Sequence, residues 1–272
     1  MSQILMFSLR TYTVFAALGF RRFSAYRLAT AAGAFTNTVF GLLRAPITMA
    51  VIGAAGGELA GYGAIEGATY AWLTQAVLTP VNVWTWDELA QRIRSGDIAV
   101  DLARPVDLQA TYLAADLGRA AFQVLPRGLP PLMVGALVTG LAMPTTVLPY
   151  VLGLLALTLG VCVSFALRWL VNLAAFWLVE LRGVLTLHMV AVGALSGLTV
   201  PVHWFPDWLA RIAAASPFPS MIQAPVDVLT GRVQGLEALA VIGVQVAWCA
   251  GLLLAGRVVL ARGVRRLVVQ GG

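Results

Sequence analysis

Side chains able to act as nucleophiles or metal ligands are sparse in this sequence of 272 residues, and they lie far apart. The chain contains two histidines and two cysteines. His188 and His203 are 15 positions apart, which is not a ligand spacing, and Cys162 and Cys249 lie alone in different apolar segments. We therefore expect no metal site, and we expect both cysteines to be small buried side chains.

Ser196 and His188 form the one arrangement with enzymatic character. His188 precedes Ser196 by two helical turns, as the base of an intramembrane hydrolase could precede its nucleophile. Gly193 and Gly197 form a GxxxG pair in the same segment, and such pairs usually let another helix approach closely. We favour helix packing. The intramembrane hydrolase stays an alternative, as does a non-transporting membrane scaffold that needs only the glycine contacts.

The sequence contains no lysine, so all 18 of its basic residues are arginines. A phosphate-binding P-loop requires a lysine, and a pyridoxal enzyme requires a lysine imine. The chain therefore cannot be its own ATPase, and we expect no cofactor in it.

Composition indicates an integral membrane protein. Hydrophobic residues make up 60% of the chain and charged residues 11%, far from the average of a soluble domain. A transmembrane helix needs about 20 mostly apolar residues. Six stretches qualify, and they predict an all-α protein with six spans in a single domain over residues 1–272: residues 28–52, 60–81, 120–142, 147–170, 184–200 and 236–255.

The arginines predict how the chain is oriented in the membrane. With the amino terminus inside, 14 of them fall in cytoplasmic segments, and four, which are Arg44, Arg127, Arg211 and Arg232, fall in or beyond the outer half. The positive-inside rule then places both termini in the cytoplasm. The positive charge indicates contact with anionic lipid, so we expect no nucleic-acid partner.

Residues 1–27 predict a helix that lies in the membrane interface. Arginines interrupt its apolar pattern, which excludes a cleavable signal peptide. Apolar side chains alternate with these arginines in a way that suits the headgroup region. The apolar set is Tyr12, Phe15, Leu18 and Phe23.

The most charged part of the chain is residues 84–107, between the second and third apolar stretches. This loop holds eight of the chain's 30 charged residues. Thr85 and Glu88 have the spacing of a capping box, and Asp87 places negative charge at the positive end of a helix. The pattern predicts that a helix begins here.

This short amphipathic helix is expected to cover residues 86–95. Glu88 lies one turn before Arg92 in this helix, so we expect the two to form an ion pair, and we expect the helix to end at Gly96. Its apolar face comprises Trp86, Leu89 and Ile93. Asp107 is expected to cap the next helix, which rises into the membrane. A compact charged helix of this kind suits the groove of a partner protein.

Four segments resemble a known family. They are RRFSAYR at 21–27, RIRSGDIAVDLARPVD at 92–107, FWLVELRG at 176–183, and PVHWFPDWLARIAAASPFPSMIQAPVDVLTG at 201–231. In this order they resemble the ABC-2 type transporter permeases, within the bacterial branch described as ABC-2 family transporter proteins. Such permeases carry an arginine, a Ser-Gly-acid turn and then Arg-Pro after the second span. The matching residues here are Arg94, Ser95, Gly96, Asp97, Arg104 and Pro105.

The resemblance implies a membrane-spanning permease subunit with the bundle of a type V exporter, located in the bacterial inner or plasma membrane. It implies a dimer with a second permease, either the same or a homologous chain, and separate ABC ATPase subunits that bind ATP and Mg. The cargo is expected to be an exported amphipathic or lipid-like molecule, such as a drug, lipid or peptide. The helix in 84–107 becomes the coupling helix, and the expected ATPase interface comprises Trp86, Glu88, Arg92, Arg94, Gly96, Asp97 and Arg104.

Two further regions are candidates for the transport route. Aromatic residues and prolines in 201–231 predict short, partly inserted extracellular helices, with an outer gate formed by Trp204, Phe205 and Trp208; the same aromatics could instead only anchor the bundle at the headgroups. Polar residues within spans are the default place to seek a substrate pathway. These are Asn37, Arg44, Arg127 and Asn172, while Arg168 is expected to reach toward the cytoplasm. Prolines interrupt the third span and leave its path open.

Overall fold

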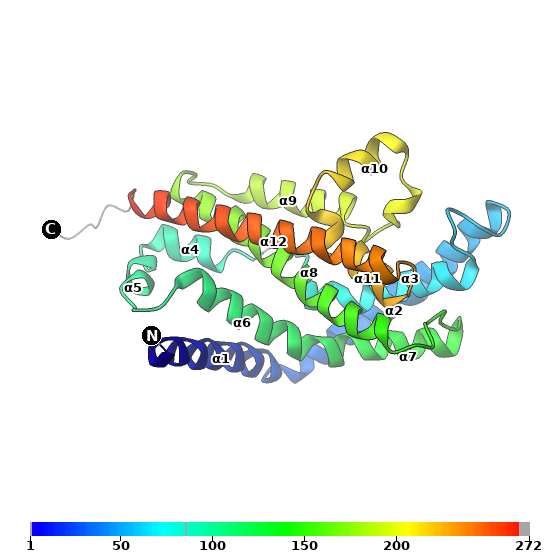
Figure 1. The fold of residues 1–272 in the computed structure, drawn as a ribbon, viewed down its shortest axis with the longest axis horizontal. Coiled ribbons are helices and arrows are strands. Elements are labelled where there is room, and N and C mark those ends of the chain that lie inside the picture. Colours follow the sequence, from blue (N-terminus) through cyan, green and yellow to red (C-terminus); the bar gives the residue numbers. More distant parts are fainter. Residues whose placement is uncertain (1, 85, 267–272) are drawn as a thin grey trace.

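The computed structural model describes residues 2–84 and 86–266, and every regular element in them is a helix (Figure 1). Four of these stretches are long and apolar enough to cross a membrane: Arg27–Ala54, Leu108–Val138, Leu148–Phe176 and Gly235–Val264. They contain the helices α2 (Arg27–Ala54), α6 (Leu108–Gln123), α7 (Leu129–Val138), α8 (Leu148–Leu173) and α12 (Gly235–Val264). Four of the six predicted stretches are thus candidate spans by length and composition.

The other two predicted stretches form shorter helices. The second is α3 (Ala64–Val81), and the fifth is α9 (Arg182–Leu195), which ends five residues before the predicted boundary at residue 200. Gly197 accounts for the early end of α9, because its φ of +83° lies in the left-handed region, which a helix cannot continue through. The predicted third span is one stretch from Leu108, the helix start that Asp107 predicted, and it includes the apolar run expected from residue 120.

α3 is buried on all sides at the centre of the bundle. Nearly every one of its residues from Gly67 onward is inaccessible, as expected of a helix that is apolar around its whole circumference. Its Trp72 ring is in contact with Gly41 of α2 and Gly135 of α7, and a Cβ at either glycine would overlap the indole. Two glycines therefore allow three helices to meet around one tryptophan.

α8 packs against α12, which lies alongside it (Figure 1). Gln245 of α12 donates hydrogen bonds to the carbonyl oxygens of Ala156 (2.9 Å) and Ser220 (2.8 Å). It thereby joins α12 and α8 to the short helix η4 (Phe218–Ser220) through buried polar contacts.

The path of the third span, left open by its prolines, is a single helical stretch with one irregular turn. α6 passes through the π-helical turn η1 (Val124–Gly128) into α7. Pro126 has no N–H to continue the α-helical ladder, which accounts for the wider turn. Pro130 and Pro131 follow in the first turn of α7 and likewise have no N–H to bond to the preceding turn.

α1 (Ser2–Ser24) packs alongside α6, and the two helices run in the same direction (Figure 1). Gly19 lies against the backbone of Ala115, and Gly118 lies against the backbone of Ala16. The predicted amino-terminal helix is therefore present, and its location in a membrane interface stays a prediction.

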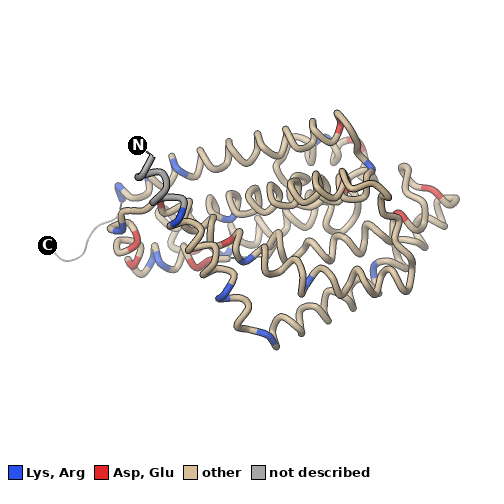
Figure 2. The backbone as a smooth tube through the Cα atoms, turned by 60° about the horizontal axis from the view of Figure 1, so that its bottom comes forward, with Lys and Arg blue, Asp and Glu red and all other residues tan. Residues whose placement is uncertain are grey.

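Short helices and loops gather at the two ends of the helical bundle. At one end lie α4 (Glu88–Ser95) and α5 (Ile98–Leu102), together with the start of α1 and the end of α12. At the other end lie the loops at 55–63 and 139–147 and the helices η3 (Val202–Trp204), α10 (Asp207–Ala214) and α11 (Gln223–Leu229). We call these the α4 end and the α10 end. Figure 2 shows that most charged positions lie toward these two ends.

Candidate functional site

α4 has the amphipathic form that the sequence predicted. Leu89 and Ile93 are buried against Phe165, Trp169 and Leu173 of α8, with Trp86 packed beside them. Gly96, with a φ of +83°, ends the helix as expected. The helix begins at Glu88, two residues later than predicted, and Thr85 of the proposed capping box lies outside the described residues.

The amino-terminal end of α4 is capped by a residue of α8. Asn172 accepts a hydrogen bond from the backbone N–H of Ala90 (3.0 Å) and donates one to the carbonyl oxygen of Trp86 (2.6 Å). An N-cap residue acts in this way, because its side-chain oxygen accepts a hydrogen bond from one of the first N–H groups of the helix. Asn172 thereby joins α4 to α8, and its expected place in a substrate pathway stays a prediction.

The expected ion pair between Glu88 and Arg92 is wrong. Arg92 Nε pairs with Asp101 Oδ2 at 2.5 Å, and Glu88 pairs with Arg22 of α1 at 3.3 Å. The physical reason is that Asp101, on the unpredicted helix α5, is buried and requires a positive partner. The hydrogen bond that Arg92 donates to Asp101 raises the pKa of Arg92, and Arg104 lies 3.8 Å from the same carboxylate.

The predicted coupling residues therefore divide into two groups. Trp86, Glu88 and Arg92 are half-buried and hold α4 against α1, α5 and α8. Four others are exposed at the tip of the α4 end: Arg94, Gly96, Asp97 and Arg104. This second group is free to meet a partner.

A groove of about 430 Å³ adjoins the exposed face of α4. Gln91 and Arg94 line one side, and Glu180 and Arg182 line the other. The backbone N–H of Arg182 donates to Glu180 Oε1 at 2.9 Å, and this bond lowers the pKa of Glu180. The FWLVELRG segment contributed to the family resemblance, but nothing in the sequence indicated that its Glu180 and Arg182 lie beside α4.

A buried triad of charges joins α6 to α8. Asp116 of α6 pairs with Arg119 at 2.7 Å and with Arg168 of α8 at 2.8 Å. Arg168 is only 2% exposed, so the expectation that it reaches toward the cytoplasm is wrong. The buried carboxylate holds its guanidinium inside the bundle, because a buried charge requires an opposite one. Asp116 and Arg119, three residues apart in the helix expected to rise from Asp107 into the membrane, were the signal that could have identified this triad.

The remaining predicted pathway residues bind backbone oxygens within the bundle. Asn37 donates to the carbonyl of Gln75 (3.1 Å), and Arg44 donates to that of Thr199 (2.9 Å). Arg127 donates to the carbonyl of Ala29 (3.1 Å). Asn37, Arg44, Arg127 and Asn172 do not converge on one site, and each joins two segments of the chain.

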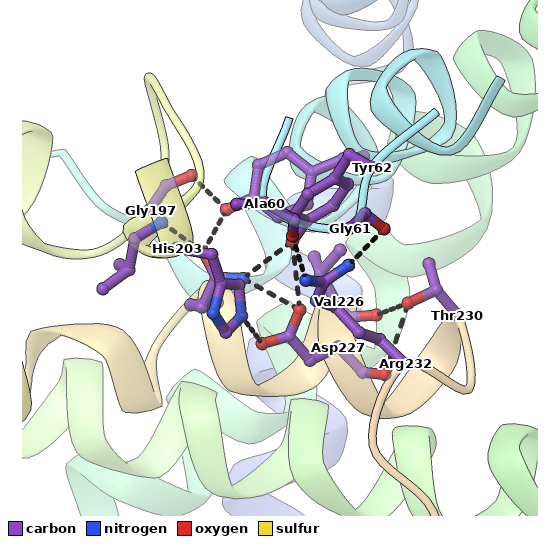
Figure 3. Close-up of polar contacts among 12 residues, drawn as sticks. Ala60, Gly61, Tyr62, Gly197, His203, Val226, Asp227, Thr230 and Arg232 are labelled. Carbon is purple, nitrogen blue, oxygen red and sulfur yellow. Dashed lines mark hydrogen bonds and ion pairs between the residues drawn. The ribbon is translucent and has the colours of Figure 1, made fainter. Parts of the chain in front are cut away.

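A polar cluster closes the α10 end (Figure 3). His203 Nε2 lies 2.9 Å from Asp227 Oδ2, and Gln223 donates to the other oxygen of that carboxylate at 2.8 Å. Arg232 lies over the Tyr62 ring at 3.9 Å and donates to the carbonyls of the loop at 55–63. Burial and the nearby Asp227 raise the pKa of Tyr62. The sequence reasoning did not single out this cluster.

The predicted gate aromatics are spread over the α10 end. Trp204 donates to the carbonyl of Leu59 (3.2 Å) and packs against Tyr62, whereas Trp208 on α10 is 60% exposed. Phe205 lies between them at the end of η3. The expectation of short helices in 201–231 is confirmed, and the role of the three aromatics as a gate stays a prediction.

The alternative intramembrane hydrolase gains no support. Ser196 Oγ accepts from the N–H of Leu198 at 3.2 Å, and His188 Nε2 is buried without a hydrogen-bond partner among the described residues. The expected GxxxG contact is also wrong. Apart from the neighbouring backbone of α9 itself, no atom of the described residues lies within 4 Å of where a Cβ of residue 193 would be, and Gly197 lies beyond the end of α9.

Comparison with known proteins supports the resemblance on which the coupling residues rest. Residues 39–271 match the family described as ABC-2 family transporter protein, and this range includes every helix from α3 to α12. Comparisons with curated proteins and with solved structures gave no match. Members of this family are generally membrane subunits without a catalytic site, and they generally work with ABC ATPase subunits. With a match over most of its length and an all-helical structure, the chain belongs to the ABC-2 family of transporter proteins.

Proposed function

We propose that this chain is the membrane-spanning permease subunit of an ATP-binding cassette transporter. In this proposal α2, α3, α6 with α7, α8, α9 and α12 form the six spans. Both termini and the α4 end face the cytoplasm of a bacterial cell. Two permeases form a dimer, and separate ATPase subunits bind ATP and Mg at the α4 end.

The observation that carries the proposal is the two-sided character of α4. Its inner face is fixed to α8 by apolar packing and by Asn172, while Arg94 remains exposed beside a groove and Asp97 is exposed just beyond the end of the helix. A helix that receives motion from a partner needs a firm attachment on one side and an accessible face on the other. α4 has both.

The attachment also suggests the direction of coupling within the subunit. ATP binding can shift the permease only if contacts differ between its two states. Movement of α4 would pass first to α8, through Asn172 and the buried apolar face. The polar cluster of Tyr62, His203, Asp227 and Arg232 would then be the contact that opens at the outer end to release an exported amphipathic cargo.

The test is a charge reversal on the exposed face of α4. In the complex purified from its own host, Arg94→Glu with Asp97→Arg should separate ATP hydrolysis from transport, lowering cargo-stimulated hydrolysis about tenfold, which is about 1.4 kcal/mol of coupling. Arg211→Glu on α10 is the matched control, because it changes an exposed arginine at the opposite end. It should leave hydrolysis unchanged.

Mass spectrometry of the purified complex provides the second readout. Recovery of a P-loop ATPase with the chain supports the proposal, and a different permease in the same sample would identify a heterodimer. Purification of the chain alone, or unchanged coupling in the double variant, would count against the assigned role of α4.

A further inference from the structure

A cavity of about 670 Å³ opens between α1, α4, α6 and α8. Phe15 and Leu18 of α1 and Phe165 of α8 give it an apolar wall. Asp116, Arg119 and Arg168, the buried triad, form its charged part. The cavity is thus amphipathic, because an apolar wall and a charged wall enclose the same space.

The triad carries more positive than negative charge. Two guanidinium groups face one carboxylate, which leaves a net charge of +1 in residues that are less than a tenth exposed. A charge in such surroundings is costly unless an opposite charge compensates it. The triad therefore favours an additional anion.

Arg168 is the member of the triad whose hydrogen-bond donors are not all used. Arg119 uses Nε on Asp116 and both Nη groups on the carbonyls of Thr79 and Pro80. Arg168 uses Nη2 on Asp116 and Nε on Ser164, and its Nη1 donates to no described residue. Two N–H groups on a cavity wall remain available for an anionic oxygen.

The mouth of the cavity extends the same charge pattern. Arg21 and Arg22 of α1 and Glu88 of α4 line it. Together with the triad this makes four arginines against two carboxylates, a net charge of +2. An anion would be attracted at the mouth and held at the triad.

We propose that this cavity binds a lipid-like amphiphile with a phosphodiester headgroup, and that this is the class of cargo the permease exports. The headgroup lies against Arg168, and the chains lie along Phe15, Leu18 and Phe165. Binding is measurable without the ATPase, whereas the identification of the ligand as cargo rests on the proposed function.

Native mass spectrometry of the purified chain tests the binding. The probes are phosphatidylglycerol and phosphatidylcholine with the same acyl chains, and inorganic phosphate. We expect a preference for phosphatidylglycerol of about tenfold over phosphatidylcholine. Phosphate alone should bind weakly, because it gains nothing from the apolar wall.

Variants of opposite charge separate a binding role from a structural one. Arg168→Gln brings the triad to zero net charge and should abolish the preference, whereas Asp116→Asn raises it to +2 and should strengthen binding of phosphatidylglycerol. A purely structural triad would weaken binding in both. Arg21→Gln, at the exposed mouth, should lower the preference several-fold without disturbing the fold. Arg211→Gln at the α10 end is the control and should change nothing.

The outcomes are distinct. Equal binding of the two lipids, or phosphate binding as tightly as phosphatidylglycerol, overturns the amphiphile site, while recovery of an ATPase would still support the permease role. In vesicles containing the complete transporter, phosphatidylglycerol should stimulate ATP hydrolysis, and Arg168→Gln should remove the stimulation. Charge-dependent binding without stimulation would identify a resident lipid and overturn the cargo assignment.

Discussion

Asn172 illustrates what single residues of this chain contribute. A lone polar side chain in an apolar span suggested a substrate pathway. Its partners are the backbone of Trp86 and Ala90, and Ala90 lies 82 positions away in the sequence. No local pattern reveals such a pairing. In contrast, the N-cap of α6 was predictable, because Asp107 accepts from the N–H of Ala110 only three residues later.

Asn172→Ala should loosen α4 from α8. Loss of an N-cap costs about 1 kcal/mol, so hydrogen exchange of the Glu88–Ser95 amides should become about fivefold faster. Gln91→Ala is the control, since the Gln91 side chain is exposed and, among the described residues, bonds only to Asp87. Equal exchange in both variants would argue that apolar packing alone holds α4 in place.

At the scale of elements, the sequence predicted where helices lie better than what they touch. Six apolar stretches were enough to locate the long helices, because each has a run of apolar residues between polar loops. α5 was missed, since five residues are too few to show a helical period. The seam between α1 and α6 was missed too, although Ala16, Gly19, Ala115 and Gly118 are all small.

Gly118→Ala should destabilise this seam. The added Cβ would overlap the Ala16 carbonyl oxygen, and overpacking of this kind costs about 1–3 kcal/mol. Thermal unfolding in detergent should therefore begin several degrees lower. Gly193→Ala is the matched control, because it lies in a helix with open space around it and should be neutral or slightly stabilising. A lowered Tm in both variants would show that the seam is not the cause.

At the scale of the whole molecule, the arginine asymmetry survives a correction from the structure. Two of the 14 arginines assigned to cytoplasmic segments, Arg119 and Arg168, are buried in the triad. Removing them leaves 12 against four, so the expected orientation is unchanged. Charge counting tolerates such errors, whereas the pairing of individual charges requires the three-dimensional structure.

Labelling with a membrane-impermeant maleimide tests that orientation. Cys162 and Cys249 are first replaced by alanine. Ser95→Cys at the α4 end should then react only in inverted vesicles, and Ala214→Cys at the α10 end only in intact cells, because both positions are exposed. Reaction of the two cysteines from the same side would overturn the proposed arrangement of the ends.

The π-helical turn Val124–Gly128 has a consequence for how the chain tolerates changes in length. A π-turn holds one residue more than an α-helical turn. Deletion of Leu125, which is 67% exposed, should convert it to regular helix while Gly135 keeps its place against Trp72. Deletion of Leu132, beyond the turn, would instead rotate the rest of α7 by about 100° and bring Ala136 against the indole. We therefore expect the chain to tolerate the loss of a residue in the π-helical turn but not in α7.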